Sequence, residues 1–156
     1  MGRERKRIYF NAEEVLTASK ILKEIKQVSG FLNVLMDREA NTFSCIIICN
    51  PNKGFKEVLL EQKRDSDIVK VISEELGLFY IIAQETDEMG ATKFLKRVYK
   101  AGKEQLNNTS DPYSAILSIK NKDDKDYIVF RLIQEFIFFS KQELRFRIDG
   151  IISSTI

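Results

Sequence analysis

The sequence predicts a single α+β domain, in which a central antiparallel β-sheet is flanked by about four helices. Three observations predict this class. The 156 residues suit one domain, and 44% apolar with 31% charged residues is an ordinary globular balance. Apolar runs typical of strands alternate with segments whose apolar residues recur at helical spacing. No repeat and no linker rich in Pro, Gly and Ser divides the chain, so we expect 1–156 to fold as one unit, with a basic N-terminal tail at 1–7.

The first predicted helix spans Ala12–Val28. Asn11 can cap this helix, and Glu14, three residues later, completes the spacing of a capping box. Two apolar runs follow, Phe31–Met36 and Thr42–Cys49, with a polar turn between them. This pattern predicts a β-hairpin.

The middle of the chain predicts two further helices and one strand. Phe55–Glu61 fits either a strand or an irregular segment, and the residues alone leave this open. Asp65–Leu76 begins with polar residues suited to a helix start and predicts a short helix. Leu78–Ala83 predicts a strand, and Glu88–Gln105 predicts a helix whose inner face carries Phe94, Leu95 and Val98.

The next apolar runs predict a second hairpin. Tyr113–Ile119 and Tyr127–Ile133 have the residue types of strands, and Lys120–Asp126 between them is strongly polar.

The C-terminal segment predicts a last helix over Lys141–Ile156. Ser140 and Glu143 stand at capping-box spacing before apolar residues that recur at helical intervals. The alternation of apolar and basic residues over Leu144–Ile148 supports a final strand instead, so this alternative stays open.

This order of elements resembles the GAF domain, a small-molecule-sensing module of profilin-like and PAS-like architecture. Tyr113–Ile119, Lys120–Asp126 and Tyr127–Phe130 are similar to the late hairpin of that family. Phe139–Leu144 looks like the start of its last helix, and Leu22–Asp37 is similar to its first helix and strand. The resemblance implies a sensor fold that dimerises through its terminal helices. No chromophore- or nucleotide-contacting motif matches, so no ligand residue is carried over.

The residue types present argue against most familiar active sites. The sequence has no histidine, which removes the commonest general base and the commonest metal-binding side chain. Cys45 and Cys49 lie in an apolar run and are interpreted as core residues, so we expect no metal site. No phosphate-binding glycine motif is present. We therefore expect no catalytic residues, no cofactor and no enzymatic activity.

Two groups of residues are candidates for contacts with other molecules. The surface of the helix at Glu88–Gln105 carries cations that could contact the phosphates of a nucleic acid, although a solvated helix face explains them equally well: Lys93, Lys96, Arg97, Lys100 and Lys103. An aromatic group near the C-terminus has the residue types of a packed core, or of a ligand or partner surface: Tyr127, Phe130, Phe136, Phe138 and Phe139.

The leading hypothesis from the sequence is therefore a non-enzymatic regulatory or sensor-type domain that binds a small ligand or a protein partner. The alternatives are a plain protein–protein interaction module, such as a scaffold or inhibitor, and a nucleic-acid-binding protein. The net charge of +2 is too small to favour nucleic acid by itself. No apolar run approaches the roughly 20 residues of a membrane span and no signal peptide is evident, so we expect a cytoplasmic protein without membrane contact.

Overall fold

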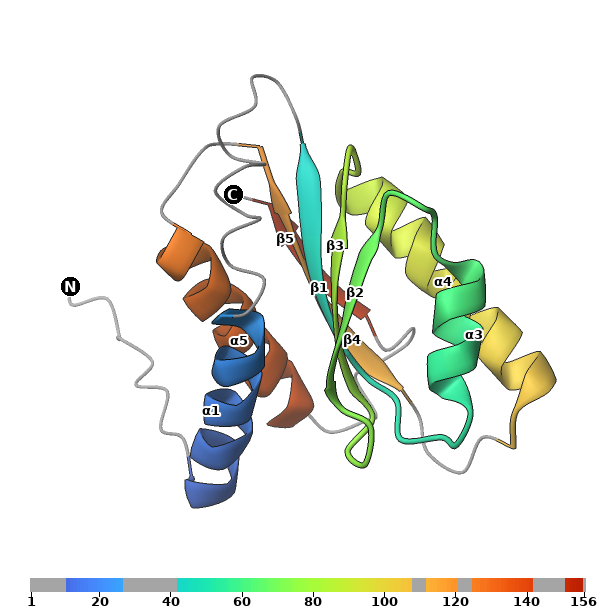
Figure 1. The fold of residues 1–156 in the computed structure, drawn as a ribbon. Helices are drawn as coiled ribbons and strands as arrows, with labels where there is room; N and C mark the ends of the chain where they lie inside the picture. The colour runs from blue at the N-terminus through green and yellow to red at the C-terminus, as the bar shows by residue number, and fades with distance from the viewer. Residues whose placement is uncertain (1–10, 27–41, 108–111, 121–124, 142–150, 156) are drawn as a thin grey trace.

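The computed structural model describes residues 11–26, 42–107, 112–120, 125–141 and 151–155. These residues form three layers, with one five-stranded sheet between two pairs of helices (Figure 1). In chain order the elements are α1 (Ala12–Lys26), β1 (Phe43–Cys49), α3 (Phe55–Gln62), β2 (Ile68–Ser73), β3 (Leu78–Ala83), α4 (Glu88–Gln105), β4 (Tyr113–Ile119), α5 (Lys125–Lys141) and β5 (Ile151–Thr155). None of the helices in this described part is long and apolar enough to cross a membrane.

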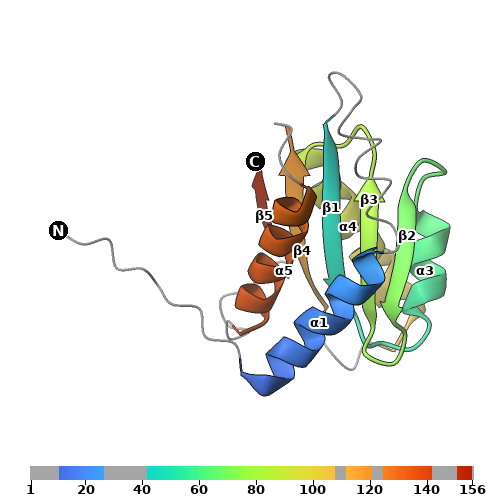
Figure 2. The same cartoon turned by 60° about the vertical axis from the view of Figure 1, so that its left-hand side comes forward.

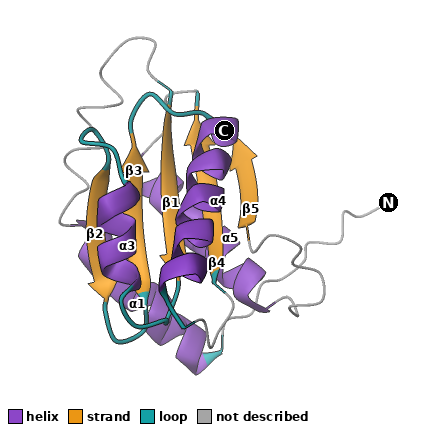
Figure 3. Ribbon diagram, turned by 90° about the vertical axis from the view of Figure 1, so that its right-hand side faces the viewer, coloured by secondary structure: helices purple, strands orange, loops and turns teal. Residues whose placement is uncertain are grey.

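The sheet has the strand order β2-β3-β1-β4-β5. β1 lies at its centre and pairs antiparallel with both β3 and β4, while β2 pairs antiparallel with β3. β5 runs parallel to β4, as the arrows in Figure 3 show, because α5 carries the chain back across the sheet between these two strands. The predicted α+β class, with four helices around a largely antiparallel sheet, is confirmed.

Each face of the sheet is covered by two helices. α1 and α5 lie side by side on one face (Figure 2), and α3 and α4 cover the other. β1 supplies both cores, because its side chains alternate: Cys45 and Ile47 face α1 and α5, whereas Ile46 and Ile48 face α3 and α4. All four are fully buried, which explains why this strand has almost no polar residues.

Several predicted elements are confirmed. α1 begins with the expected capping box, in which Glu14 N donates to Asn11 Oδ1 at 2.9 Å and Asn11 N donates to Glu14 Oε1 at 3.4 Å. α4 and β3 have the predicted bounds. The run at 42–49 is a strand as predicted, but the other arm of that hairpin, Phe31–Met36, lies outside the described residues.

The two predictions for residues 55–76 are wrong. Phe55–Gln62 is the helix α3, which begins after Gly54 at a φ of 90° and buries Phe55 and Leu59 against α4. The predicted helix over 65–76 is instead the strand β2, part of a hairpin with β3. The β-branched residues of β2 suit a sheet. Asp67, one of the polar residues that suggested the start of a helix, binds Arg64 with its side chain instead.

The second predicted hairpin is also wrong. Tyr127–Ile133 belongs to α5, whose buried residues recur in two rows at intervals of four: Ile128, Leu132 and Phe136, and Val129, Ile133 and Ile137. β4 has no hairpin partner at 127–133 and pairs instead with β1 and β5. The predicted final helix is contradicted at Ile151–Thr155, which forms β5, while residues 142–150 lie outside the described part.

Candidate ligand-binding cleft

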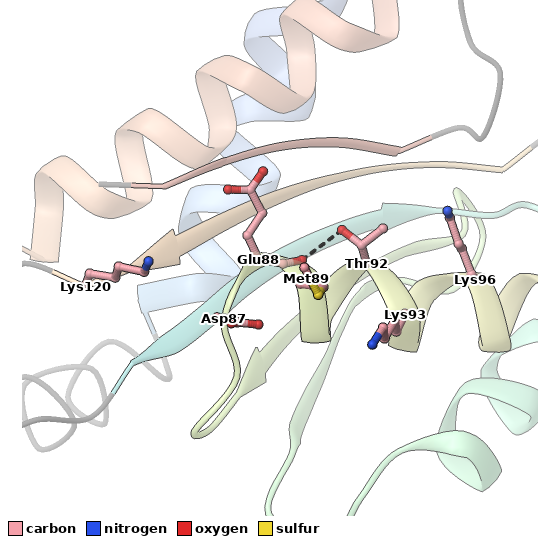
Figure 4. Close-up of a pocket in the computed structure, with 7 residues that line it drawn as sticks. All are labelled: Asp87, Glu88, Met89, Thr92, Lys93, Lys96 and Lys120. Carbon is pink, nitrogen blue, oxygen red and sulfur yellow. Dashed lines mark hydrogen bonds between the residues drawn. The ribbon is translucent and has the colours of Figure 1, made fainter.

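Two cavities open beside the N-terminal half of α4, and Asp87 and Lys93 border both of them. The first has a volume of about 540 Å³ and is drawn in Figure 4. The second has a volume of about 500 Å³ and lies where the start of β2, the end of β3 and α4 meet. We call the second one the Arg64 cleft. Its lining residues are Thr42, Arg64, Asp67, Ala83, Glu85, Thr86, Asp87, Gly90, Lys93, Phe94 and Arg97.

Two of the residues that line the first cavity, Glu88 and Thr92, already serve the fold. Thr92 Oγ1 donates to the Glu88 carbonyl at 2.8 Å, which is an intrahelical contact, as the dashed line in Figure 4 shows. The Glu88 carboxylate accepts a hydrogen bond from Ser153 Oγ of β5 at 2.6 Å. Lys96 and Lys120 supply positive charge around Glu88. The Ser153 contact holds β5 to α4, so Glu88 and Thr92 are already engaged within the protein.

The Arg64 cleft is organised around a buried carboxylate. The Asp67 side chain is 1% exposed and that of Arg64 is 49% exposed. Asp67 Oδ2 accepts from the Arg64 backbone N at 2.9 Å, and Asp67 Oδ1 accepts from Arg64 Nη2 at 3.0 Å. Arg64 Nη2 also donates to the Gln84 carbonyl at 2.9 Å and to Thr86 Oγ1 at 2.5 Å. The guanidinium is thus fixed between β2 and the segment that joins β3 to α4.

A second guanidinium, that of Arg97, also borders the cleft and is held in place. Arg97 Nη2 donates to the Gln62 carbonyl at 3.0 Å, and the Arg97 guanidinium carbon lies 5.4 Å from the centre of the Phe94 ring. This separation is within the range of a cation–π contact. A guanidinium held in this way has further N–H donors in its own plane, and these suit an anion.

Acidic groups complete the cleft. Asp87 caps α4, since its Oδ1 accepts from Gly90 N at 2.8 Å. Glu85 has a φ of 48°, the one left-handed non-glycine backbone in the described residues. Together Asp67, Glu85 and Asp87 balance the three cations Arg64, Lys93 and Arg97. A cleft of this mixed charge suits a ligand that offers anions together with hydrogen-bond donors.

The predicted basic residues divide between the two cavities and the open surface. All five cations are exposed on α4. Lys93 and Arg97 border the Arg64 cleft, Lys93 and Lys96 border the first cavity, and Lys100 and Lys103 border neither. The sequence reasoning missed Arg64, Asp67 and Glu85, although an arginine and an aspartate three residues apart beside a strand are a pairing signal.

The predicted aromatic group does not form one surface in the described residues. Phe136 is buried in the core and stacks on Tyr113 with ring centres 5.1 Å apart. Tyr127 and Phe130 are exposed on α5. The side chains of Phe138 and Phe139 lie outside the described part.

The cysteines and carboxylates do not assemble a metal site in the described residues, where no three potential ligands come together. Burial raises the pKa of the Cys45 thiol to about 12, although a hydrogen bond from Tyr80 acts in the opposite direction. The interpretation of Cys45 as a core residue is confirmed, because this side chain is fully buried.

Comparison with known proteins identifies the fold. No family model matches the sequence, and no curated protein matches it. Among solved structures, the chain is similar to the GGDEF domain of DgcB from Caulobacter crescentus, crystallised in complex with c-di-GMP. The TM-score is 0.54 at 8% identity, over 94% of this chain and 98% of that one. The fold is GGDEF-like.

The prediction of a GAF domain is therefore wrong. The GAF resemblance depended on a late hairpin and a final helix, and the structure has α5 and β5 in those places. The hypothesis of a non-enzymatic sensor depended in part on that resemblance, and the expectation that the chain is not an enzyme depended on the missing histidine and phosphate-binding motifs. The similarity to a GGDEF domain contradicts both. At this identity the GGDEF similarity shows the fold alone, and the sequence contains no consecutive Gly-Gly-Asp-Glu-Phe.

Proposed function

We propose that this chain has a c-di-GMP-related function, in which the Arg64 cleft binds a guanine dinucleotide. The observation that carries the proposal is the cleft itself, where two fixed guanidiniums lie beside three carboxylates. The GGDEF-like fold supports it, because the similar domain was crystallised with c-di-GMP.

The chemistry of such a ligand matches the cleft. Each phosphodiester carries a negative charge, which an arginine or lysine can bind. Guanine presents O6 and N7 acceptors, to which an arginine donates two hydrogen bonds, and an amino group that donates to a carboxylate. The cleft supplies both kinds of partner, with Arg64, Lys93 and Arg97 as donors and Glu85 as an acceptor. A ligand with phosphate alone would leave the carboxylates facing an anion.

The two arginines are held before a ligand arrives. Asp67, Gln84 and Thr86 fix Arg64, while Gln62 and Phe94 fix Arg97. Immobilising a long side chain on binding costs roughly 0.5–1.5 kcal/mol, and this cost is reduced where the protein has already ordered the group.

Calorimetric titration with c-di-GMP, GTP, ATP and c-di-AMP tests the proposal. We expect the guanine dinucleotide to bind most tightly. We expect Arg97→Ala to weaken it at least about tenfold, which is a loss of about 1.4 kcal/mol. Lys100→Ala is the matched control, because Lys100 is an exposed cation of the same helix outside the cleft. No saturable binding of any guanine nucleotide, or equal losses in both variants, would contradict the proposed site.

A catalytic role is tested separately with the same protein. Incubation with GTP and Mg²⁺ or Mn²⁺, followed by chromatography of the nucleotides, measures whether two GTP molecules are joined through two phosphodiester bonds into the cyclic dinucleotide, with release of two pyrophosphates. Product formation would extend the proposed function from binding to synthesis. Binding without product would place the function in recognition of the dinucleotide.

A further inference from the structure

Glu85 lies at a position of the Arg64 cleft where the backbone disfavours a side chain. Its φ of 48° is in the left-handed region, which glycine adopts freely and other residues adopt at a cost. Within the described part of the chain, no other non-glycine residue has such a backbone. Strained backbone of this kind is concentrated at functional sites. A glutamate at this position therefore indicates a role for its carboxylate.

Contacts of the two neighbouring residues hold Glu85 in this conformation. On one side, the Gln84 carbonyl accepts a hydrogen bond from Arg64 Nη2 at 2.9 Å. On the other side, the buried Thr86 donates its backbone N–H to the Thr42 carbonyl at 3.1 Å. A strained backbone persists where the surrounding structure fixes it in this way. The Glu85 backbone is therefore held at the border of the cleft before a ligand binds.

The three carboxylates of the cleft differ in how far the fold already uses them. Asp67 is 1% exposed, and both of its oxygens accept hydrogen bonds from Arg64. Asp87 caps α4 by accepting from Gly90 N at 2.8 Å. Glu85 is exposed, and its side chain makes no hydrogen bond or ion pair with the residues that the structure describes. Both Glu85 oxygens are therefore available to hydrogen-bond donors of a ligand.

The two purine bases offer different groups to such a carboxylate. Guanine carries adjacent donors on one edge, N1–H and the N2 amino group, and the two oxygens of a carboxylate can accept from both. Adenine carries an acceptor at N1, which would face the negative oxygens, and its amino group is a single donor. A carboxylate at this edge therefore favours guanine, because adenine would leave one of its oxygens facing a lone pair.

We infer, resting on the function proposed for the cleft, that Glu85 is the residue that selects guanine over adenine there. Its carboxylate accepts from N1–H and N2–H of one base of the dinucleotide. Lys93 and Arg97 border the same cleft and supply positive charge for the phosphodiesters. One bidentate contact of this kind separates the right base from the wrong one by roughly 10- to 100-fold in affinity.

Calorimetric titration of the full chain with c-di-GMP, c-di-AMP and c-di-IMP tests this role. The hypoxanthine dinucleotide c-di-IMP keeps N1–H but lacks the N2 amino group, so its affinity should lie between the other two. Glu85→Gln should lower the ratio of c-di-GMP to c-di-AMP affinity at least about tenfold, because the amide replaces one acceptor with a donor. Glu104→Gln is the matched control and should keep the ratio, since it removes the same charge from an exposed position of α4 outside the cleft.

Urea denaturation separates base selection from a purely structural role of Glu85. Glu85→Gln should keep the wild-type urea midpoint while it loses the base preference. Glu85→Gly should unfold at a midpoint no lower than that of the wild type, because glycine removes the strain of the left-handed backbone. A lower midpoint in both variants would mean that Glu85 serves the fold, and would overturn the role in base selection.

The titrations also distinguish a failure of this role from a failure of the proposed function. If the wild type binds c-di-GMP and c-di-AMP equally well, or if Glu85→Gln keeps the wild-type ratio, Glu85 does not select the base, even where Arg97→Ala still weakens binding. An equal change of the ratio in Glu104→Gln would also overturn the role. If no dinucleotide saturates the wild type, the proposed function is wrong, and this role falls with it.

Discussion

Gly77 and Gly102 differ in what a side chain at each position would meet. Gly77 turns the β2–β3 hairpin with a φ of 68°, and a Cβ there would lie 2.2 Å from the Asn50 carbonyl oxygen. Gly102 is inside α4, where the nearest atom to a new Cβ is 3.8 Å away on the Phe55 ring. Glycine is therefore required by steric contacts at position 77, whereas position 102 has room for a side chain.

The two glycine-to-alanine substitutions should have opposite effects on stability. Gly77→Ala should lower the free energy of unfolding by more than about 1 kcal/mol, because the alanine adopts a left-handed backbone and collides with another backbone segment. Gly102→Ala should raise it by roughly 0.5–1 kcal/mol, since alanine has the higher helix propensity and fits the space. Urea denaturation of both variants measures the difference. A stabilised Gly77→Ala would contradict the close approach of the hairpin to Asn50.

At the scale of elements, β1 and β3 are joined across their pairing by a polar contact inside an apolar core. Tyr80 OH donates to Cys45 Sγ at 3.3 Å, and both side chains are buried. Burial raises the pKa of Cys45 to about 12 and raises the pKa of Tyr80 well above 10, and the neighbouring Cys45 adds to the second shift. Both groups are therefore neutral in the folded protein at a pH where an exposed thiol ionises.

This pair predicts a loss of stability at high pH. The unfolded chain releases the Cys45 proton near pH 9, while the folded chain keeps it until about pH 12. The folded state thus binds more protons in this window, and the free energy of unfolding falls as the pH rises, by up to about 1.4 kcal/mol per pH unit for this group. Urea denaturation at pH 8, 9 and 10 measures the slope. Cys45→Ala should show a shallower slope, and an unchanged slope would assign the loss to other groups.

The helices and strands differ in how well a local sequence pattern could predict them. The bounds of α4 could be predicted because its apolar residues recur at helical spacing and Asp87 precedes it. Those of β3 could be predicted because it is an unbroken apolar run that begins directly after Gly77. α3 and β2 could not be predicted, because each mixes apolar with charged residues over only 6–8 positions, and this mixture fits either a helix or a strand. In α5, the first apolar residues read as a strand until Phe136 and Ile137 continue the rows of four.

At the scale of the whole molecule, β1 joins the two helical layers. Ile47 packs with α1 and α5, and Ile46 packs with α3 and α4. If either pair of helices separates from the sheet, one face of β1 is exposed to water. The other pair of helices packs on the opposite face of the same strand. This shared strand predicts that the described elements unfold together, as expected for the single domain inferred from the sequence.

Truncation of either β1 residue should therefore destabilise one common transition. We expect Ile46→Ala and Ile47→Ala each to cost about 2–5 kcal/mol, with the same midpoint by far-UV circular dichroism and by tyrosine fluorescence. Leu60→Ala, at an exposed position, serves as the control and should change little. Two separate transitions in either variant would show that the layers fold independently.

The candidate cleft was predictable only in part. Lys93 and Arg97 were identified as exposed cations, because charged residues of a helix reveal its outer face. Arg64 and Asp67 were missed, since polar residues before an apolar run look the same whether they cap a helix or pair with each other. Their role depends on Gln84 and Thr86, about 20 residues away in the chain.

The sequence by itself determined the α+β class, the helices α1 and α4, the strands β1, β3 and β4, and the absence of histidine chemistry. The apolar residues of those elements form a local pattern: they recur at helical spacing where one face is buried, and they run without a break where both faces of a strand are buried. Only the tertiary structure decided that β4 pairs with β1 and β5, that β5 is parallel, and that the fold is GGDEF-like. Strand partners are chosen by which apolar faces can be buried together, and that choice depends on residues far apart in the chain.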